Sequence, residues 1–193
     1  MHRTVKVTYP CPRVASPLFF HNPEGEDGFI SNWFVAPFVA DGILCQTVEQ
    51  AFMLAKARFF GDVAIETALR NEKKPKKCKQ QGRSMAGFNA KTWNEASKIV
   101  IADLIRAKFD QHPELRRKLL ATGNRVLAEA PQDPIRAIGM LSDDARAWDP
   151  RAWTGDNCLG GALSFERNHI RNSVPFVAVL NIFLFILNNR SLT

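Results

Sequence analysis

The chain has 193 residues, which one domain with a sizeable hydrophobic core accounts for most simply. Its apolar content of 46% and charged content of 23% are ordinary for a soluble globular protein, so composition sets it apart from disordered and membrane-embedded chains. A formal net charge of +7 favours anionic partners, either phosphate esters or nucleic acid, and does not by itself indicate DNA binding.

The cysteines and histidines give no metal-binding pattern. The cysteines are dispersed and predict free thiols in a reducing compartment, which with the lack of a signal peptide favours the cytoplasm or nucleus: Cys11, Cys45, Cys78 and Cys158. The four histidines form no ligand cluster. We therefore expect neither a metal nor another cofactor.

Residues 1–27 are expected to lead into the main domain. Residues 4–9 alternate like a short strand, and a proline-rich loop follows. Asp41-Gly42 separates two apolar runs within residues 35–44, which predicts a hairpin of two short strands. This arrangement places Ser31, Asn32 and Trp33 on a connecting segment close to the helix that comes next.

That helix, over residues 46–60, is the segment around which we expect the site to form. Thr47 can cap its start, and Gly61 can end it. At about 100° per residue, Val48, Phe52 and Phe59 share one apolar face of an amphipathic helix. The opposite side of the helix is expected to carry the remaining residues Gln50, Leu54 and Arg58.

Glu49 and Lys56 stand seven residues apart, between two apolar groups of this helix and about 10 Å apart in rise. Charges on a buried face are costly unless something pairs or uses them. One interpretation is that both side chains extend from the rim of the core to water, or pair elsewhere. The other is that they belong to a functional site.

Further helices are predicted along the rest of the chain. Pro75 divides the basic run 70–83 into a helix end and a new helix start, in which Lys79 and Arg83 stand one turn apart and can face inward. The other lysines of this run are expected on a solvated face. Helices are expected over 94–109, with Ile99, Ile101, Ala102, Ile105 and Phe109 as apolar contacts, then over 113–122 and from 157 to about 171. A short strand over 127–130, a turn over 131–139 and an ordered loop over 141–155 complete a mostly helical α+β domain.

Residues 174–187 are almost wholly apolar, but they are shorter than a usual membrane span of about 20 residues. We favour an element packed on the domain or at a dimer interface. A marginal tail anchor and an error at the end of the gene remain alternatives, and residues 172–193 are treated as an extension.

A set of ordered motifs resembles the NADAR family of YbiA-like N-glycosidases over about residues 28–171. The matching pieces are Ser31-Asn-Trp-Phe34, Pro37-Phe38, Asp41-Gly42, Thr47-Val-Glu-Gln-Ala-Phe52, Lys56-Ala57, Gly82-Arg83, Trp93, Lys108-Phe109, Leu119-Leu-Ala-Thr-Gly123, Glu129, Asp133 and Trp153-x-Gly-x-Asn-x-Leu-Gly160. The resemblance implies a compact, mostly helical single domain that cleaves an N-glycosidic bond to a ribose. Two substrate classes are implied: ADP-ribose on guanine in nucleic acid, and phosphoribosyl-amino-pyrimidine intermediates of riboflavin biosynthesis.

The chain departs from the family pattern in two places. Gln50 stands where a histidine is usual after the helix glutamate, and Arg136-Ala137 replaces a Trp-Gly pair. The missing aromatic weakens stacking of a base on this segment. Arg136 can instead hold a phosphate or stack through its guanidinium plane.

The resemblance implies that Glu49 acts in acid–base catalysis and that Lys56 attacks ribose C1′ to form a Schiff base. The residues expected to bind substrate are Asn32, Trp33, Lys79, Arg83, Trp93, Asp133, Trp153, Asn157 and Gly160. Several have structural alternatives: helix capping for Asn157, core packing for the tryptophans, and a turn for Asp133.

The function expected from these features is hydrolysis that removes ADP-ribose from guanine in DNA, RNA or free nucleotide. The alternatives are the same chemistry on riboflavin intermediates, and a non-catalytic module that binds ADP-ribose or nucleic acid. The departures at Gln50 and Arg136 favour the last of these.

Overall fold

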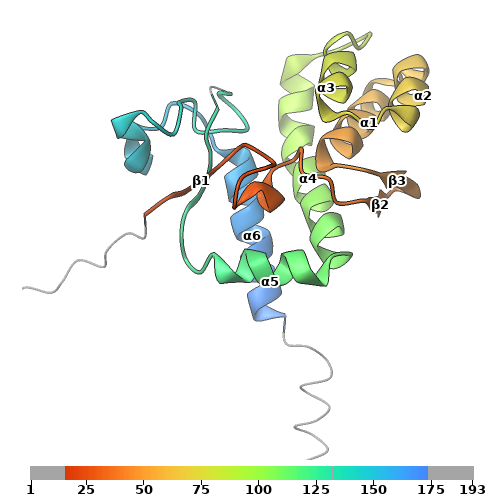
Figure 1. The fold of residues 1–193 in the computed structure, drawn as a ribbon. Coiled ribbons are helices and arrows are strands. Elements are labelled where there is room, and N and C mark those ends of the chain that lie inside the picture. The colour runs from red at the N-terminus through yellow and green to blue at the C-terminus, as the bar shows by residue number, and fades with distance from the viewer. Residues whose placement is uncertain (1–15, 132, 174–193) are drawn as a thin grey trace, which may run out of the picture.

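The computed structural model describes residues 16–131 and 133–173, which contain six α-helices, four short strands and three 3₁₀ helices (Figure 1). The prediction of a mostly helical fold is confirmed. The strand expected over residues 4–9 and the apolar segment 174–187 lie outside the described residues.

The predicted hairpin is confirmed. Strands β2 (Phe38–Ala40) and β3 (Ile43–Cys45) pair antiparallel. Asp41 has φ 47° and Gly42 has φ 75°, and two successive left-handed residues are what a tight two-residue hairpin turn requires. The hairpin leads directly into helix α1 (Val48–Phe60).

Both predicted ends of α1 are confirmed. The Thr47 side chain accepts a hydrogen bond from the Gln50 backbone N–H at 3.2 Å, and Gly61 ends the helix at φ 71°. Gln50 also uses its side-chain amide: its Oε1 accepts from Gln46 N at 2.7 Å, and its Nε2 donates to Leu69 O at 3.0 Å. The residue that departs from the family pattern therefore joins the start of α1 to the next helix.

The expectation that α1 is buried along one face only is wrong. Helices α2 (Val63–Asn71), α3 (Pro75–Arg83) and α4 (Ala90–Asp110) all pack against it. Gln50 and Leu54, expected on the outer side, are therefore buried, whereas Phe59, expected in the core, is 50% exposed. Central placement is what makes the burial of Glu49 and Lys56 possible.

Helices α4, α5 (Pro113–Ala121) and α6 (Cys158–Asn172) form the other half of the helical core, with α6 packed against α4 and α5. Ile101, Ile105 and Phe109 of α4 are buried as expected. Ile99 is 69% exposed, so its expected core contact is wrong: it lies on a side of α4 that the other described elements leave uncovered.

A pair of short parallel strands joins the start of the described chain to the segment that follows α5. Strand β1 (Leu18–Phe20), within the segment expected to be a proline-rich loop, pairs with β4 (Leu127–Glu129), and Leu18 lies opposite Leu127. The predicted strand after residue 127 is confirmed, and its partner was missed because three residues between prolines give little alternation. A small second core lies beside this pair, formed by Ala128, Ala130, Ile138, Met140 and Ala147.

The remaining segments are short. The 3₁₀ helix η1 (Gly28–Ile30) precedes the hairpin, and η2 (Ala145–Trp148) and η3 (Pro150–Ala152) lie within the expected ordered loop. Three cysteines, Cys45, Cys78 and Cys158, are free. In the described part of the chain, every helix is too short or too polar to cross a membrane.

Candidate active site

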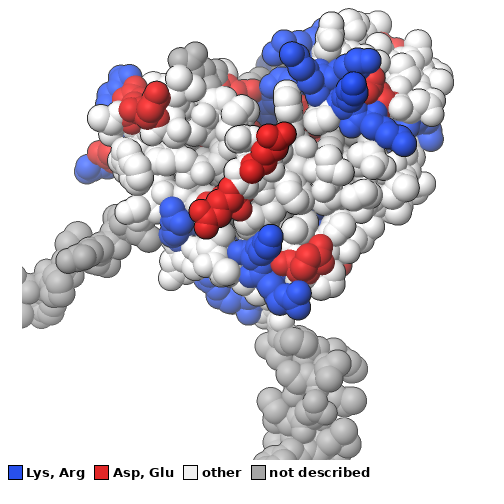
Figure 2. All heavy atoms as spheres, viewed as in Figure 1, with Lys and Arg blue, Asp and Glu red and all other residues white. Residues whose placement is uncertain are grey.

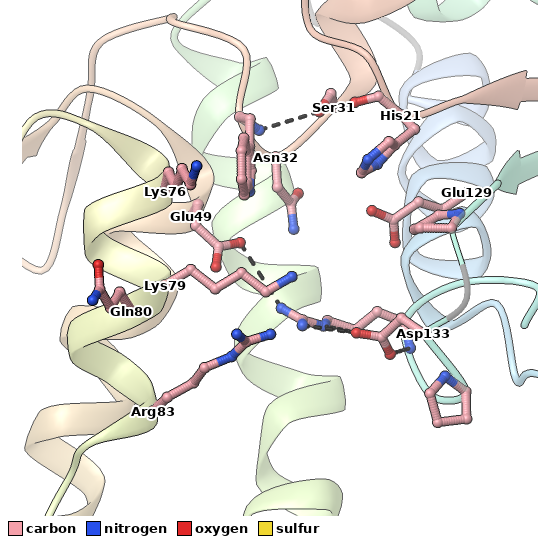
Figure 3. A pocket seen from close by; sticks show the side chains of 14 residues that line it. His21, Ser31, Asn32, Glu49, Lys76, Lys79, Gln80, Arg83, Glu129 and Asp133 are labelled. Atoms are coloured by element: carbon pink, nitrogen blue, oxygen red, sulfur yellow. Dashed lines mark hydrogen bonds and ion pairs between the residues drawn. The ribbon is translucent and has the colours of Figure 1, made fainter.

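A cavity of about 770 Å³ opens between α1 and α3 on one side and the segments around β1 and β4 on the other (Figure 3). Most of the charged side chains that line it point inward. Its walls are formed by His21, Ser31, Asn32, Trp33, Glu49, Lys76, Lys79, Gln80, Arg83, Glu129, Pro131, Asp133, Pro134 and Arg136. Six of the eleven predicted site residues are among them.

Glu49 lies in the first turn of α1, and its residue is only 2% exposed. Its Oε2 is 3.9 Å from Arg136 Nη1, whereas its Oε1 is buried without a hydrogen-bond partner among the described residues. Burial raises the pKa of Glu49, and the positive charges of Arg136 and Lys79 oppose that rise. The group is therefore a buried carboxyl with one oxygen free to meet a ligand.

Arg136 organises the negative charges of the cavity. Its Nη2 donates to Asp133 Oδ2 at 2.8 Å and its Nε donates to the same oxygen at 3.2 Å. Burial favours the neutral form of Asp133, but the Arg136 backbone N–H and guanidinium outweigh it and lower the pKa of Asp133. Asp133 also accepts from Ile135 N at 3.1 Å, so it both fixes the turn and lines the cavity.

Lys56 lines a smaller adjoining cavity of about 190 Å³. Its Nζ donates to Gly82 O at 2.7 Å and lies 4.0 Å from the centroid of the Phe88 ring. Burial and the charge of Arg136 lower the pKa of Lys56. Glu49 and Lys56 thus do not line the same cavity, although both cavities share four residues: Lys79, Arg83, Asp133 and Arg136.

Helix α3 forms the basic wall. Lys76, Lys79 and Arg83 all line the larger cavity, and Lys79 Nζ lies 6.0 Å from the Trp33 ring centroid. Lys and Arg side chains gather over the region of α2 and α3 in Figure 2. The exposed members on α3 and just before it are Lys73, Lys74, Lys76 and Lys77, as expected for a solvated basic face.

Lys108, a buried lysine of α4, binds the backbone of the segment that carries Ser31, Asn32 and Trp33. Lys108 is 2% exposed, and its Nζ donates to Phe29 O at 2.6 Å and to Ser31 O at 3.4 Å. Burial lowers the pKa of Lys108 to about 7. Asn32 is only 5% exposed, and its side chain points into the cavity (Figure 3).

Four predicted residues lie outside the larger cavity in addition to Lys56. Trp93 lines the smaller cavity, where it packs against Phe52 at a centroid distance of 5.2 Å. Trp153 packs on the second core and donates from Nε1 to Ala147 O at 2.8 Å. Neither Asn157 nor Gly160 lines either cavity.

Asn157 and Gly160 instead join helix α6 to strand β4. Asn157 Nδ2 donates to Leu127 O at 2.8 Å, and its Oδ1 accepts from Glu129 N at 3.2 Å. The side chain therefore does not cap α6, although Asn157 is the N-cap residue. A Cβ at Gly160 would overlap the Leu127 carbonyl, so glycine permits this close approach.

Several cavity residues were not singled out as site residues from the sequence. His21 and Glu129 come from β1 and β4 or directly after them, and only the pairing of those strands brings them to the site. Glu129 has two signals in the sequence: it is one of the pieces that match the family pattern, and it is a polar residue at the end of an apolar strand. Arg136 was noted as a departure, but its contact with Glu49 could not be read from spacing.

Among residues 16–131 and 133–173, no group of three or more His, Cys, Asp or Glu side chains is placed to hold a metal ion. The charged groups that line the two cavities are carboxyl, amine and guanidinium groups. Such a set suits acid–base or nucleophilic chemistry on an anionic ligand.

Comparison with known proteins identifies the family of this domain. Residues 18–171 match the NADAR domain, and the chain belongs to that family. The matched range includes β1, the first strand of the described structure.

Individual relatives agree. The chain is 35% identical over 118 residues to N-glycosidase R617 of Acanthamoeba polyphaga mimivirus, covering 61% of this chain and 69% of R617. It is 32% identical over 151 residues to N-glycosidase YbiA of Escherichia coli strain K12, covering 78% and 86%. The solved NMR structure of E. coli YbiA superposes with a TM-score of 0.63 at 28% identity, covering 81% and 85%.

A more distant relative is the riboflavin biosynthesis protein VVA0006 of Vibrio vulnificus strain YJ016. It is 23% identical over 160 residues, which is 83% of this chain but 40% of VVA0006.

Proposed function

We propose that this protein is an N-glycosidase that hydrolyses the bond between ribose C1′ and a base nitrogen, and that it removes ADP-ribose from guanine. The observation that carries the proposal is the buried Glu49 carboxyl facing the basic wall of a cavity of about 770 Å³. That volume is within the usual range for small-molecule sites of about 300–1,000 Å³. Relatives that bear the name N-glycosidase support the reaction class.

The charge distribution supports a substrate with two phosphates. Lys76, Lys79 and Arg83 on α3 supply positive charge along one wall, and a guanidinium can bind phosphate oxygens through two parallel hydrogen bonds. Trp33 on the same side offers a ring face for a base. The exposed lysines of the α3 region add attraction for nucleic acid that salt would weaken.

Lys56 is the proposed nucleophile. Its lowered pKa leaves more of the neutral amine, which can attack C1′ and form a Schiff base. The Gly82 carbonyl at 2.7 Å accepts from the amine and fixes its position in the smaller cavity, which shares four lining residues with the larger one. Glu49 then serves as the carboxylate that handles protons at the sugar.

Turnover of ADP-ribosylated guanosine beside a phosphoribosyl-amino-pyrimidine riboflavin intermediate tests the substrate. The expected result is release of guanosine, and its loss in Glu49→Gln. The riboflavin intermediate is the second candidate, favoured by the likeness to VVA0006. Binding of ADP-ribose without release from either substrate would show a non-catalytic module.

Borohydride reduction in the presence of ADP-ribose tests the nucleophile separately. We expect a stable adduct on Lys56, read by mass spectrometry of the digested protein. Lys79→Met is the matched control, because Lys79 lines both cavities: it should weaken binding but leave the adduct site unchanged. Activity that survives in Lys56→Ala, without an adduct, would disprove the covalent route.

A further inference from the structure

We propose that Glu129 is a second catalytic carboxyl, which donates a proton to the base nitrogen as its bond to C1′ breaks. This inference rests on the N-glycosidase function proposed above and assigns the acid of that reaction. Figure 3 shows Glu129 across the cavity from Glu49, with both carboxyl groups directed inward.

The backbone holds Glu129 firmly. As the last residue of β4 it lies opposite Phe20 of β1, and its N–H donates to Asn157 Oδ1 at 3.2 Å. Its carbonyl accepts from Ile138 N at 2.9 Å. The side chain therefore starts from a backbone fixed on both sides, as a group that must meet a reacting atom requires.

The Glu129 carboxyl group has few polar partners. Glu129 Oε2 is buried and has no hydrogen-bond partner in the described part of the chain. Asp133, in the same cavity, accepts from the Arg136 guanidinium at 2.8 Å. No basic side chain among the described residues lies within 4.0 Å of the Glu129 carboxyl. A buried oxygen without a donor favours the protonated acid, whose O–H can donate to a ligand.

The charges that face Glu129 come from every wall of the cavity. The pKa of Glu129 is raised to about 7. Burial is the largest cause, Asp133 and Glu49 add to the rise, and Arg136 and Lys79 oppose it. His21 also lines the cavity, and burial and Lys79 lower the pKa of His21, so it supplies no positive charge at neutral pH.

The two glutamates are thereby given different roles. Burial raises the pKa of both, but only Glu49 has a guanidinium at 3.9 Å to stabilise its ionised form. An acid and a base in one site need surroundings that favour opposite protonation states. The guanidinium beside Glu49, with no basic side chain of the described residues within 4.0 Å of Glu129, supplies that difference, and on it we assign Glu129 as the acid and Glu49 as the base.

The proposed step balances. The C1′–N bond breaks, its electron pair goes to the base nitrogen, and the proton of the Glu129 carboxyl moves to that nitrogen. The attacking nucleophile supplies the electron pair of the new bond at C1′, and one water is consumed when the sugar is released. Glu129 ends as a carboxylate and regains its proton from solvent. The step is the same whether water or an amine attacks.

The test compares Glu129→Gln with Glu129→Asp on ADP-ribosylated guanosine across pH about 5 to 9. Glutamine keeps the shape but has no acid proton, so kcat should fall by about 10²–10⁴-fold with little change in KM. The unmodified protein should lose activity as pH rises past about 7, and Glu129→Gln should lack this alkaline fall. Glu129→Asp should restore part of the rate together with the fall. Glu95→Gln, an exposed glutamate on α4, is the matched control and should behave as the unmodified protein.

Each outcome decides the question. A Glu129→Gln protein with kcat within about twofold of the unmodified protein, or with the alkaline fall intact, overturns the acid role. A change confined to KM would make Glu129 a binding residue only. If the unmodified protein releases no base from any substrate, the proposed function fails and this inference falls with it. Unfolding temperatures of the variants, measured in parallel, identify any loss of rate that comes from misfolding.

Discussion

Replacing Arg136 with methionine removes the guanidinium that stands between two carboxylates of the cavity. Arg136 lies 3.9 Å from Glu49 and 2.8 Å from Asp133, and the Glu49 side chain is 2% exposed. Without Arg136 the Glu49 carboxylate is left unpaired where water hardly reaches. We expect the free energy of unfolding to fall.

The size of this fall can be worked out in two ways. Two unit charges 3.9 Å apart attract by about 4 kcal/mol at an effective dielectric constant of about 20. Glu49 can also escape by binding a proton, and protonating a carboxyl with an ordinary pKa of about 4.3 at pH 7 costs about 3.7 kcal/mol. Methionine regains some packing against Phe52, so the expected loss is about 3 kcal/mol at pH 7.

The loss should depend on pH. Since the folded-state pKa of Asp133 is lowered, its contribution to stability is present at neutral pH and disappears as pH falls through that folded value. Glu49, whose pKa burial raises, takes up its proton at a higher pH than Asp133 does, so the part of the loss that comes from Glu49 disappears first. The difference between Arg136→Met and the unmodified protein should therefore shrink between pH about 7 and 4, while the part that comes from Asp133 remains at pH about 4 because that carboxylate is still ionised.

Urea unfolding at both pH values provides the measurement, and Arg151→Met is the matched control. Arg151 makes the same kind of contact, at 2.8 Å to Asp149, but the two side chains are 89% and 44% exposed. The control should unfold at the same urea concentration as the unmodified protein. An Arg136→Met protein that also does so, or whose loss is the same at both pH values, would refute the reasoning.

Three further predictions concern the frame of the site. Burial lowers the pKa of Lys108 to about 7, so between about pH 7 and 10 the unfolded chain binds more protons than the folded one, and the free energy of unfolding should rise with pH. Lys108→Met should remove this rise, which urea midpoints measure. The same dependence on pH in both proteins would contradict the prediction. Gly160→Ala should lower the free energy of unfolding by about 2 kcal/mol or more, because the added Cβ overlaps the Leu127 carbonyl. Gly161→Ala should raise it by about 0.5–1 kcal/mol, because a Cβ there meets open space. Similar shifts of the unfolding temperature in the two variants would contradict this geometry. Asn157→Ala should lower the free energy of unfolding by about 2 kcal/mol, since one buried and one partly buried hydrogen bond to β4 are lost. An unchanged urea midpoint would show that they contribute nothing.

The ends of α1 could be predicted because their causes are local. Thr47 and Gly61 act within one turn of the helix, and Asp41-Gly42 fixes the hairpin in the same way. The pitch of the helix also places Glu49 and Lys56 on one line. What they meet is not local: Lys56 Nζ donates to Gly82, 26 residues later, and this contact puts it in the smaller cavity.

The exposure of single side chains, and which residues meet in the cavity, are harder to predict because both depend on contacts between segments distant in sequence. Phe59 and Ile99 look like core residues by spacing, but their burial depends on which elements pack nearby. Glu129 and Arg136 reach the cavity through strand pairing and a turn that no periodic pattern encodes. Asn157 lies where a helix cap is expected, yet its amide is used by β4.

The β1–β4 pair also has a consequence for how the protein folds. Leu18 pairs with Leu127, 109 positions later, so this contact closes a loop that contains α1 to α5. Closing long loops is entropically costly, and contacts of large sequence separation slow folding. The helices can form and pack on one another first, whereas the wall that carries Glu129 is completed only when β4 pairs with β1. We expect the cavity to be completed late, so a folding intermediate with native helices would bind no ligand.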